Sequence, residues 1–210
     1  MTFETWGAFV LASSVLLMIP GPTILLVMSY ALSKGRSVAV ASAAGVALGD
    51  LVAMTASLAG LGALVLASAT AFTVLKWVGA VYLVYLGVKL LRSATEETLS
   101  LPEADKSVTP RGVFAHAAAV TALNPKSIAF FIAFVPQFIR PEAAILPQMA
   151  LLVATFVSLA TLNALAYALL ADRLRSVIAQ PKALVWMTRT GGATLVAMGL
   201  LTTTLKRATP

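Results

Sequence analysis

Residues 5–33 read TWGAFVLASSVLLMIPGPTILLVMSYALS, an apolar run interrupted near its centre by the Pro-Gly-Pro of residues 20–22. A helix needs roughly 20 mostly apolar residues to cross a hydrocarbon core of about 30 Å, and this run is long enough. A proline removes one backbone donor and clashes with the carbonyl four residues earlier. The run therefore predicts a membrane span that is broken near its middle, with the carbonyls of Leu16 and Met18 freed.

A second apolar run, residues 112–138, contains a comparable interruption. It reads Leu-Asn-Pro-Lys-Ser at residues 123–127, where Pro125 frees the carbonyl of Thr121 in the same way. Pro22 aligns with Pro125 at an offset of 103 residues. Freed carbonyls persist in hydrocarbon only where protein or trapped water satisfies them, so neither break is expected to face lipid.

The composition of the chain is typical of a membrane protein. Of its 210 residues, 60% are hydrophobic and 11% are charged, and the mean hydropathy is +0.93; soluble domains are nearer about half apolar and a quarter charged. About six apolar segments are long enough to span a membrane: residues 5–33, 38–66, 72–91, 112–138, 147–170 and 186–205. We therefore expect an all-α, polytopic membrane protein with no room for a second, soluble domain.

The two halves of the chain share a spacing of glycines. Gly79 and Gly87 lie eight residues apart in the third segment, as do Gly191 and Gly199 in the sixth, and each pair follows a tryptophan. The offset between the pairs is 112 residues, so the halves match if the second carries a few more loop residues. Glycine and proline are common in membrane helices generally, but two matches in the same order favour a repeat. With three spans per half, the second copy enters the membrane upside down, as in many secondary transporters.

The charged residues predict the organisation and the orientation. A polar linker at 96–110 separates a first three-helix repeat, 1–95, from a second, inverted one, 111–210. Lysine and arginine concentrate in cytoplasmic loops. Ten of them flank the first, third and fifth loops, four lie on the opposite side and one lies inside a span. The odd-numbered loops and the linker are therefore expected in the cytoplasm and both termini outside, although Lys206 and Arg207 argue mildly against this.

Several function classes are disfavoured by the sequence. The formal charge is +7, but the basic residues are scattered at segment ends and form no patch that would neutralise phosphates, so nucleic-acid binding is not expected. There is no cysteine, which excludes disulfides and thiolate chemistry. No P-loop, metal-binding motif or Ser–His pair indicates an enzyme or a cofactor. The first segment lacks a basic start and a cleavage motif, so we expect it to be a retained span.

A broken helix creates a new helix N-terminus at mid-membrane. The backbone N–H groups near Thr23 and Ile24, and near Ser127 and Ile128, are expected to lack partners inside their helices. With the helix dipole behind them they form a site for an anion such as a carboxylate, as in transporters with discontinuous helices. The alternative is two ordinary proline kinks that only shape packing. The candidate substrate-binding residues are Pro20, Gly21, Pro22, Thr23, Asn124, Pro125 and Lys126.

Asp50 is the only acidic residue well inside a predicted span. It lies about 20 Å of helix from Arg36, at about 1.5 Å per residue. A carboxylate in the membrane is costly unless it is paired, hydrated or protonated, so it is a functional candidate by default. Gly45 and Gly49 precede it in a G-x-x-x-G pattern, which lets a neighbouring helix approach closely and bury the carboxylate against protein.

Lys126 is the matching cation, in the second break. Two roles compete for this pair of charges. In the first, Asp50 and Lys126 form a structural ion pair. In the second, Asp50 meets a substrate ammonium or a coupling proton while Lys126 helps to hold a carboxylate. A third interpretation places one of them in water at the edge of a cavity.

Other polar residues are weaker candidates. Gln137 and Asn163 form a second tier of site residues. Like Gln148, each fits a helix-to-helix hydrogen bond better than a substrate contact. His116 is the only histidine and thus a candidate pH-responsive group, but its place near the start of a span fits an interfacial role better.

These motifs resemble those of a known transporter family. Pro20-Gly21-Pro22 with the following residues 31–36, and the stretch 44–50 that ends in Asp50, resemble two signatures of the lysine exporter / homoserine-threonine resistance (LysE/RhtB) family. Residues 82–87, Tyr-Leu-Val-Tyr-Leu-Gly, and residues 123–138, with Asn-Pro-Lys, Phe-Phe and Pro-Gln-Phe, resemble two more. The similarity extends over nearly the whole chain.

The resemblance implies a protein of the bacterial cytoplasmic (inner) membrane that exports amino acids or close derivatives, with protons as the coupling ion. The outward direction comes from the resemblance alone, and no motif determines the substrate. The residues themselves lead to a site at the midplane between the repeats. There a substrate carboxylate meets the half-helix N-termini and Lys126, and the ammonium meets ionised Asp50.

Other functions stay open at this point. The same architecture suits an exporter of another small solute, such as a cation or an organic acid. A non-transporting membrane scaffold is another alternative, although buried charges would have no role in it. A homo-oligomer is also left open, because several small residues can pack either within one chain or between copies: Gly79, Ala80, Gly191 and Gly192.

Overall fold

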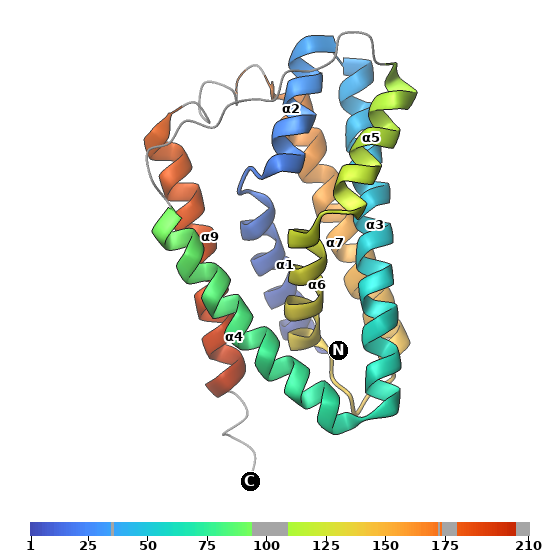
Figure 1. The fold of residues 1–210 in the computed structure, drawn as a ribbon, viewed down its shortest axis with the longest axis vertical. Coiled ribbons are helices and arrows are strands. Elements are labelled where there is room, and N and C mark those ends of the chain that lie inside the picture. The colour runs from blue at the N-terminus through green and yellow to red at the C-terminus, as the bar shows by residue number, and fades with distance from the viewer. Residues whose placement is uncertain (35, 94–108, 172, 174–179, 205–210) are drawn as a thin grey trace.

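The computed structural model describes residues 1–34, 36–93, 109–171, 173 and 180–204, and in these the chain is helical with no strand (Figure 1). The elements are, in chain order, α1 (Phe3–Leu17), α2 (Pro22–Lys34), α3 (Arg36–Ala67), α4 (Ala69–Ser93), α5 (Pro110–Ala122), α6 (Pro125–Phe134), the 3₁₀ helix η1 (Val135–Phe138), α7 (Ile145–Leu169) and α9 (Pro181–Thr204). Residues 94–108, which include most of the predicted linker at 96–110, lie outside the described residues, as do the side chains of Pro22, Pro125 and Lys126.

The all-α, polytopic prediction is confirmed. Within the described residues, three helices are long and apolar enough to cross a membrane, over Ser37–Ala63, Ala69–Ser93 and Ile145–Leu169. A fourth is added if the pair Pro110–Ala122 and Ser127–Phe138, bent by 49°, counts as one span. Helix α1 and the Thr23–Leu32 part of α2 are apolar but shorter. The count of about six spans, which joins α1 to α2 and adds α9, remains a prediction.

Both predicted helix breaks are confirmed. Helix α1 ends at Leu17 and α2 begins at Pro22, while α5 ends at Ala122 and α6 begins at Pro125. Each proline is thus the first residue of its helix, where the missing N–H removes no helical hydrogen bond. Each predicted break therefore separates its segment into two helices, α1 and α2 in the first and α5 and α6 in the second.

The helices form two groups, and α1 and α6, one half of each broken segment, lie between these groups (Figure 1). Helix α4 packs mainly against α9, and α3 packs mainly against α5 and α7. Helix α1 contacts α7 and α9, and α6 contacts α3 and α4, so both lie between the groups. This arrangement brings the two breaks to the middle of the molecule, between the α4–α9 pair and the other helices.

Glycines bring α3 into close contact with α5, as the G-x-x-x-G pattern predicts. A Cβ added to Gly49 would lie 2.5 Å from the Cβ of Thr121 and 2.7 Å from the carbonyl oxygen of Ala118. A Cβ on Gly45 would collide with the α5 backbone. This contact leaves Asp50, the next residue along α3, only 6% exposed.

A second glycine contact joins α4 to α9. A Cβ on Gly87 would lie 2.5 Å from the carbonyl oxygen of Gly192, and one on Gly199 would lie 2.7 Å from that of Ala80. The backbones of α4 and α9 therefore approach as closely as the absence of side chains permits. The sequence left open whether four small residues pack within one chain or between copies. In the structure all four have contacts within this chain: Gly79, Ala80, Gly191 and Gly192.

We predict that Gly49→Ala destabilises the protein. Alanine favours a helix by about 1 kcal/mol over glycine, but overpacking against α5 costs typically about 1–3 kcal/mol. The apparent Tm in detergent, followed by tryptophan fluorescence, should fall by several degrees. Gly60→Ala is the matched control on α3, because a Cβ there meets nothing within 4 Å and should leave the Tm unchanged or higher. Equal Tm values for both variants would contradict the close packing of α3 on α5.

Candidate functional site

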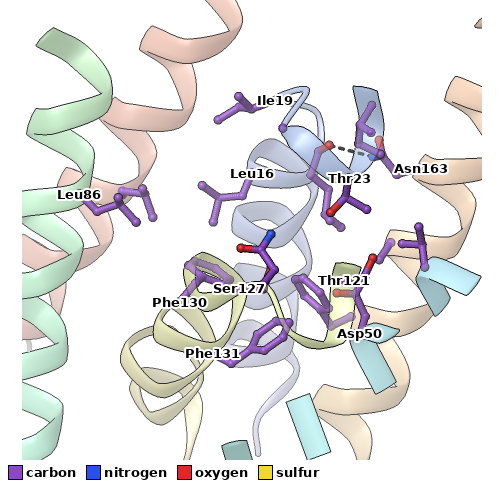
Figure 2. Close-up of a pocket in the computed structure, with 18 of the residues that line it drawn as sticks. Leu16, Ile19, Thr23, Asp50, Leu86, Thr121, Ser127, Phe130, Phe131 and Asn163 are labelled. Carbon is purple, nitrogen blue, oxygen red and sulfur yellow. Dashed lines mark hydrogen bonds between the residues drawn. The ribbon is translucent and has the colours of Figure 1, made fainter. Parts of the chain in front are cut away.

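A cavity of about 170 Å³ lies where the two helix breaks meet (Figure 2). Every described α-helix contributes to its wall, from α1 to α9. The residues of its lining that carry polar groups or break the helices are Gly21, Thr23, Asp50, Thr121, Asn124, Ser127 and Asn163. The cavity therefore gathers residues from both halves of the chain.

The N-termini of α2 and α6 both open into this cavity. Their first turns begin with the bonds from Leu25 N–H to Gly21 O, 2.9 Å, and from Ile128 N–H to Asn124 O, 3.1 Å. The N–H groups before these bonds, including that of Thr23, have no acceptor within their helix. Two helix N-termini with positive dipole ends therefore lie at the same cavity.

The carbonyl end of the first break is satisfied by α7. Asn163 donates its side-chain amide to the carbonyl of Leu17 at 2.8 Å (dashed in Figure 2), and the Tyr167 hydroxyl donates to that of Met18 at 2.6 Å. Asn163 and Tyr167 are four residues apart and thus share one face of α7. The predicted freeing of the Met18 carbonyl is matched by a side-chain donor from another helix.

The other freed carbonyls are satisfied locally. Leu16 O accepts the backbone N–H of Ile19 at 3.2 Å, and Thr121 O accepts that of Asn124 at 3.3 Å. Both bonds span three residues, which is a tightened turn at a helix end. These four carbonyls are therefore paired within the protein, whereas residues at the start of the next helices line the cavity.

Asp50 and Thr121 line the same side of the cavity (Figure 2). Asp50 is 6% exposed and has no ion-pair partner among the described residues. Thr121 is 2% exposed, and its hydroxyl has no hydrogen-bond partner in that part of the chain. A buried carboxylate and a buried hydroxyl, neither with a partner among the described side chains, therefore lie side by side at the cavity.

Not all predicted site residues reach the cavity. Pro20 is buried but does not line it. Gln137 donates its amide to the carbonyls of Lys76 and Ala133, each at 3.0 Å, which is a contact of η1 with α4 and α6. The predicted helix-to-helix hydrogen bond of Gln137 is therefore present. The predicted role of the Lys126 side chain falls outside the described residues.

Two other polar residues have structural partners. Gln148 accepts the backbone N–H of Arg140 at 3.0 Å and donates to the Arg140 carbonyl at 3.0 Å, which fixes the turn before α7. His116 is exposed on α5, and its Nδ1 lies 2.8 Å from the hydroxyl of Tyr30. Neither residue lines the cavity.

Thr121 and Tyr167 were not among the residues singled out for their side chains. Thr121 stands four residues before Pro125 in an otherwise apolar stretch, and Tyr167 stands one turn after Asn163. Two sequence signals indicate them: Thr121 is a polar residue one turn before a break, and Tyr167 lies one turn from the polar Asn163, so each shares a helix face with its neighbour.

A cavity lined by the ends of two interrupted helices and by a buried carboxylate is typical of secondary transporters. The chain belongs to the LysE family: a family model described as LysE type translocator matches residues 14–205. It is therefore a transporter and not an enzyme, and the resemblance drawn from its motifs is confirmed.

Similar proteins are found in several bacteria. The chain is 34% identical to a homoserine/homoserine lactone efflux protein of Salmonella typhimurium over 99% of this chain and all of the relative. It is 31% identical to an uncharacterized membrane protein of Vibrio cholerae over 98% of this chain and all of that protein. It is 30% identical to a leucine efflux protein of Salmonella choleraesuis over 66% of this chain and 65% of the relative. No solved structure matches.

We predict that Tyr167→Phe destabilises the first break. The substitution removes the hydroxyl that donates to the Met18 carbonyl, and a lost hydrogen bond costs about 0.5–1.5 kcal/mol. The apparent Tm in detergent should fall by about 1–6 °C for a chain of this size. Tyr85→Phe is the control, since Tyr85 is 59% exposed and should leave the Tm unchanged. A Tm loss shared by both variants would point to a general effect of the missing hydroxyl.

Proposed function

We propose that this protein is a secondary exporter of amino acids or close derivatives from the bacterial cytoplasm, coupled to protons, and that the substrate binds in the cavity. The observation that carries this proposal is the convergence of two helix N-termini and the buried Asp50 on one cavity. An α-amino acid carries one carboxylate and one ammonium, so the cavity offers a complementary group to each.

The carboxylate meets the start of α2 and α6 in this proposal. Thr23 and Ser127 line the cavity, their N–H groups precede the first helical bonds, and both helix dipoles favour an anion there. The hydroxyls of the same two residues add donors. Lys126, the second residue of α6, supplies a further positive charge to the carboxylate.

The ammonium meets ionised Asp50. The close contact of α3 with α5 excludes lipid from this carboxylate, and the Thr121 hydroxyl on the same side can accept from the ammonium. Protonation of Asp50 from the outside removes the charge that holds the ammonium and so favours release. A proton that moves inward through the full field supplies about 2.3 kcal/mol per 100 mV, which can drive uphill export.

The α4–α9 contact supports the inverted repeat. Gly87 meets Gly192 across this interface, and Gly199 meets Ala80. At the offset of 112 residues, Gly87 corresponds to Gly199 and Ala80 corresponds to Gly192. The two contacts are therefore one contact seen from each half, as a two-fold axis between inverted repeats requires. Motion of one repeat against the other would then open the cavity to each side in turn.

The ends of the helices support an orientation. The N-terminus and the α3–α4 junction lie at one end of the molecule, and the α2–α3 junction and the start of α5 lie at the other (Figure 1). The latter end carries the more basic loops, so we assign it to the cytoplasm, with both termini outside.

The relatives support the substrate class and the direction of transport. One relative that aligns along its whole length is named a homoserine/homoserine lactone efflux protein, and another is named a leucine efflux protein. Both names describe outward movement of an amino acid or of its derivative. The same class and direction are proposed for this chain.

We predict that Asp50→Asn abolishes export. Loss of a buried charge partner costs about 3–5 kcal/mol, which corresponds to a fall of at least about 100-fold in the initial rate. The measurement is efflux from cells preloaded with a panel of amino acids, compared with an empty vector and normalised to protein in the membrane. Glu4→Gln is the control, because Glu4 is exposed at the start of α1.

Each outcome of this experiment bears on a different part of the proposal. Efflux that survives Asp50→Asn contradicts the coupling role of this carboxylate but not export. The absence of efflux of every amino acid from the intact chain contradicts amino-acid export and points to another small solute or to a scaffold.

We predict that Thr121→Val lowers export without destabilising the fold. Valine keeps the shape that packs against Gly49 but removes the hydroxyl, and a lost hydrogen bond of about 0.6–1.4 kcal/mol reduces the efflux rate about 3- to 10-fold. Ser13→Ala is the matched control, because the Ser13 hydroxyl is also buried without a partner among the described residues but does not line the cavity. Equal rates for the two variants would remove Thr121 from the site.

A further inference from the structure

The cavity has two chemically different sides. Asp50, Thr121 and Asn163 line one side, on α3, α5 and α7. The residues that α4 and α9 contribute to the opposite side are leucines alone: Leu86, Leu90 and Leu195. Figure 2 shows Leu86 across the cavity from Asp50 and Thr121. One end of a bound molecule therefore meets charge and hydrogen-bonding groups, and the other end meets hydrocarbon.

The apolar side continues onto the broken helices. Leu16 and Ile19, at the end of α1 and in the first break, lie between Leu86 and the polar side (Figure 2). The Phe130 ring lines the cavity from α6 and stacks on Phe134 behind it, with ring centroids 4.5 Å apart. The aromatic stack fixes the position of this wall, so the apolar side is a built surface and not a gap between mobile chains.

This surface discriminates between the side chains of amino acids. A charged group placed against leucines loses its hydration without a partner, and a hydroxyl loses its hydrogen bonds to water. An aliphatic or aromatic side chain gains from the same contact because it leaves water. Among the described lining residues, Asp50 alone has an ionisable side chain, so a second charge on the substrate finds no second partner there.

We propose that α4 and α9 form a side-chain subsite, with Leu86, Leu90 and Leu195 as specificity-determining residues, and that the substrates are amino acids with uncharged, apolar side chains. This inference rests on the proposed function, since it assumes that the ammonium and the carboxylate occupy the polar side. The side chain then points away from Asp50 toward the α4–α9 pair. Leucine and phenylalanine fit this subsite, whereas homoserine and lysine do not.

The test is transport by the purified full chain in proteoliposomes with an imposed proton gradient. The substrates are labelled leucine, phenylalanine, homoserine and lysine, and the initial rates are compared at one concentration. We expect leucine to exceed lysine by at least about 10-fold and homoserine by several-fold, which is the range that an apolar pocket supports. A preference for lysine or homoserine would overturn the subsite while leaving amino-acid export intact.

Two substitutions locate the preference. Leu86→Ala enlarges the subsite and should raise the rate ratio of phenylalanine to leucine about 5-fold, and Leu86→Thr should raise the ratio of homoserine to leucine by a similar factor. Val78→Ala is the control on α4, because Val78 is 58% exposed and lies away from the cavity. Ratios that stay unchanged in both Leu86 variants overturn the assignment of the subsite to α4. The absence of transport of all four amino acids overturns the proposed function, and this inference with it.

Discussion

The structure depends on one constraint, the cost of unpaired backbone groups inside a membrane. The two proline-containing breaks create such groups at the middle of the chain's first and fourth apolar segments. Four of their carbonyls are paired within the protein, two of them with Asn163 and Tyr167 of α7. The residues that begin the next helices, α2 and α6, line the cavity, and their first N–H groups have no acceptor within their own helix. The positive ends of two helix dipoles therefore lie at the cavity.

Close packing of α3 on α5 places a buried carboxylate at the same cavity. Glycines at positions 45 and 49 bring the two helices together, and the same contact buries Asp50 beside the second break. A carboxylate at this depth would otherwise attract water or lipid head groups. Because the glycines set the distance between the helices, the burial of Asp50 follows from the absence of side chains at these two positions. The α4–α9 pair adds an apolar wall opposite this charge.

The parts of this picture that follow from local chemistry could be predicted from the sequence. Proline acts on the carbonyl four residues away, so both breaks and the starts of α2 and α6 were predictable, and so was the close helix contact at Gly45 and Gly49. The contacts of a side chain depend on how its helix is rotated about its axis, and these contacts could not be predicted. Thr121 lines the cavity and Tyr167 donates to the first break, and sequence spacing alone does not show which helix face turns inward. The expected helix-to-helix bond of Gln137 is present, but its two acceptors, one carbonyl of α4 and one of α6, did not follow from the sequence. The side chain of Lys126 is not described, so its place beside Asp50 stays a prediction.

The pairing of α4 with α9 also has a consequence for biogenesis. Helix α4 packs mainly against the last helix of the chain, and almost the whole second half is synthesised between the two. While the ribosome is still at work, the glycine-lined surface of α4 has no protein partner and must be covered by lipid or by an insertion factor. Because Leu195 of α9 forms part of the cavity wall, the lining of the cavity is complete only when α9 has entered the membrane. A chain truncated before α9 would therefore insert most of its helices but would lack one wall of the cavity.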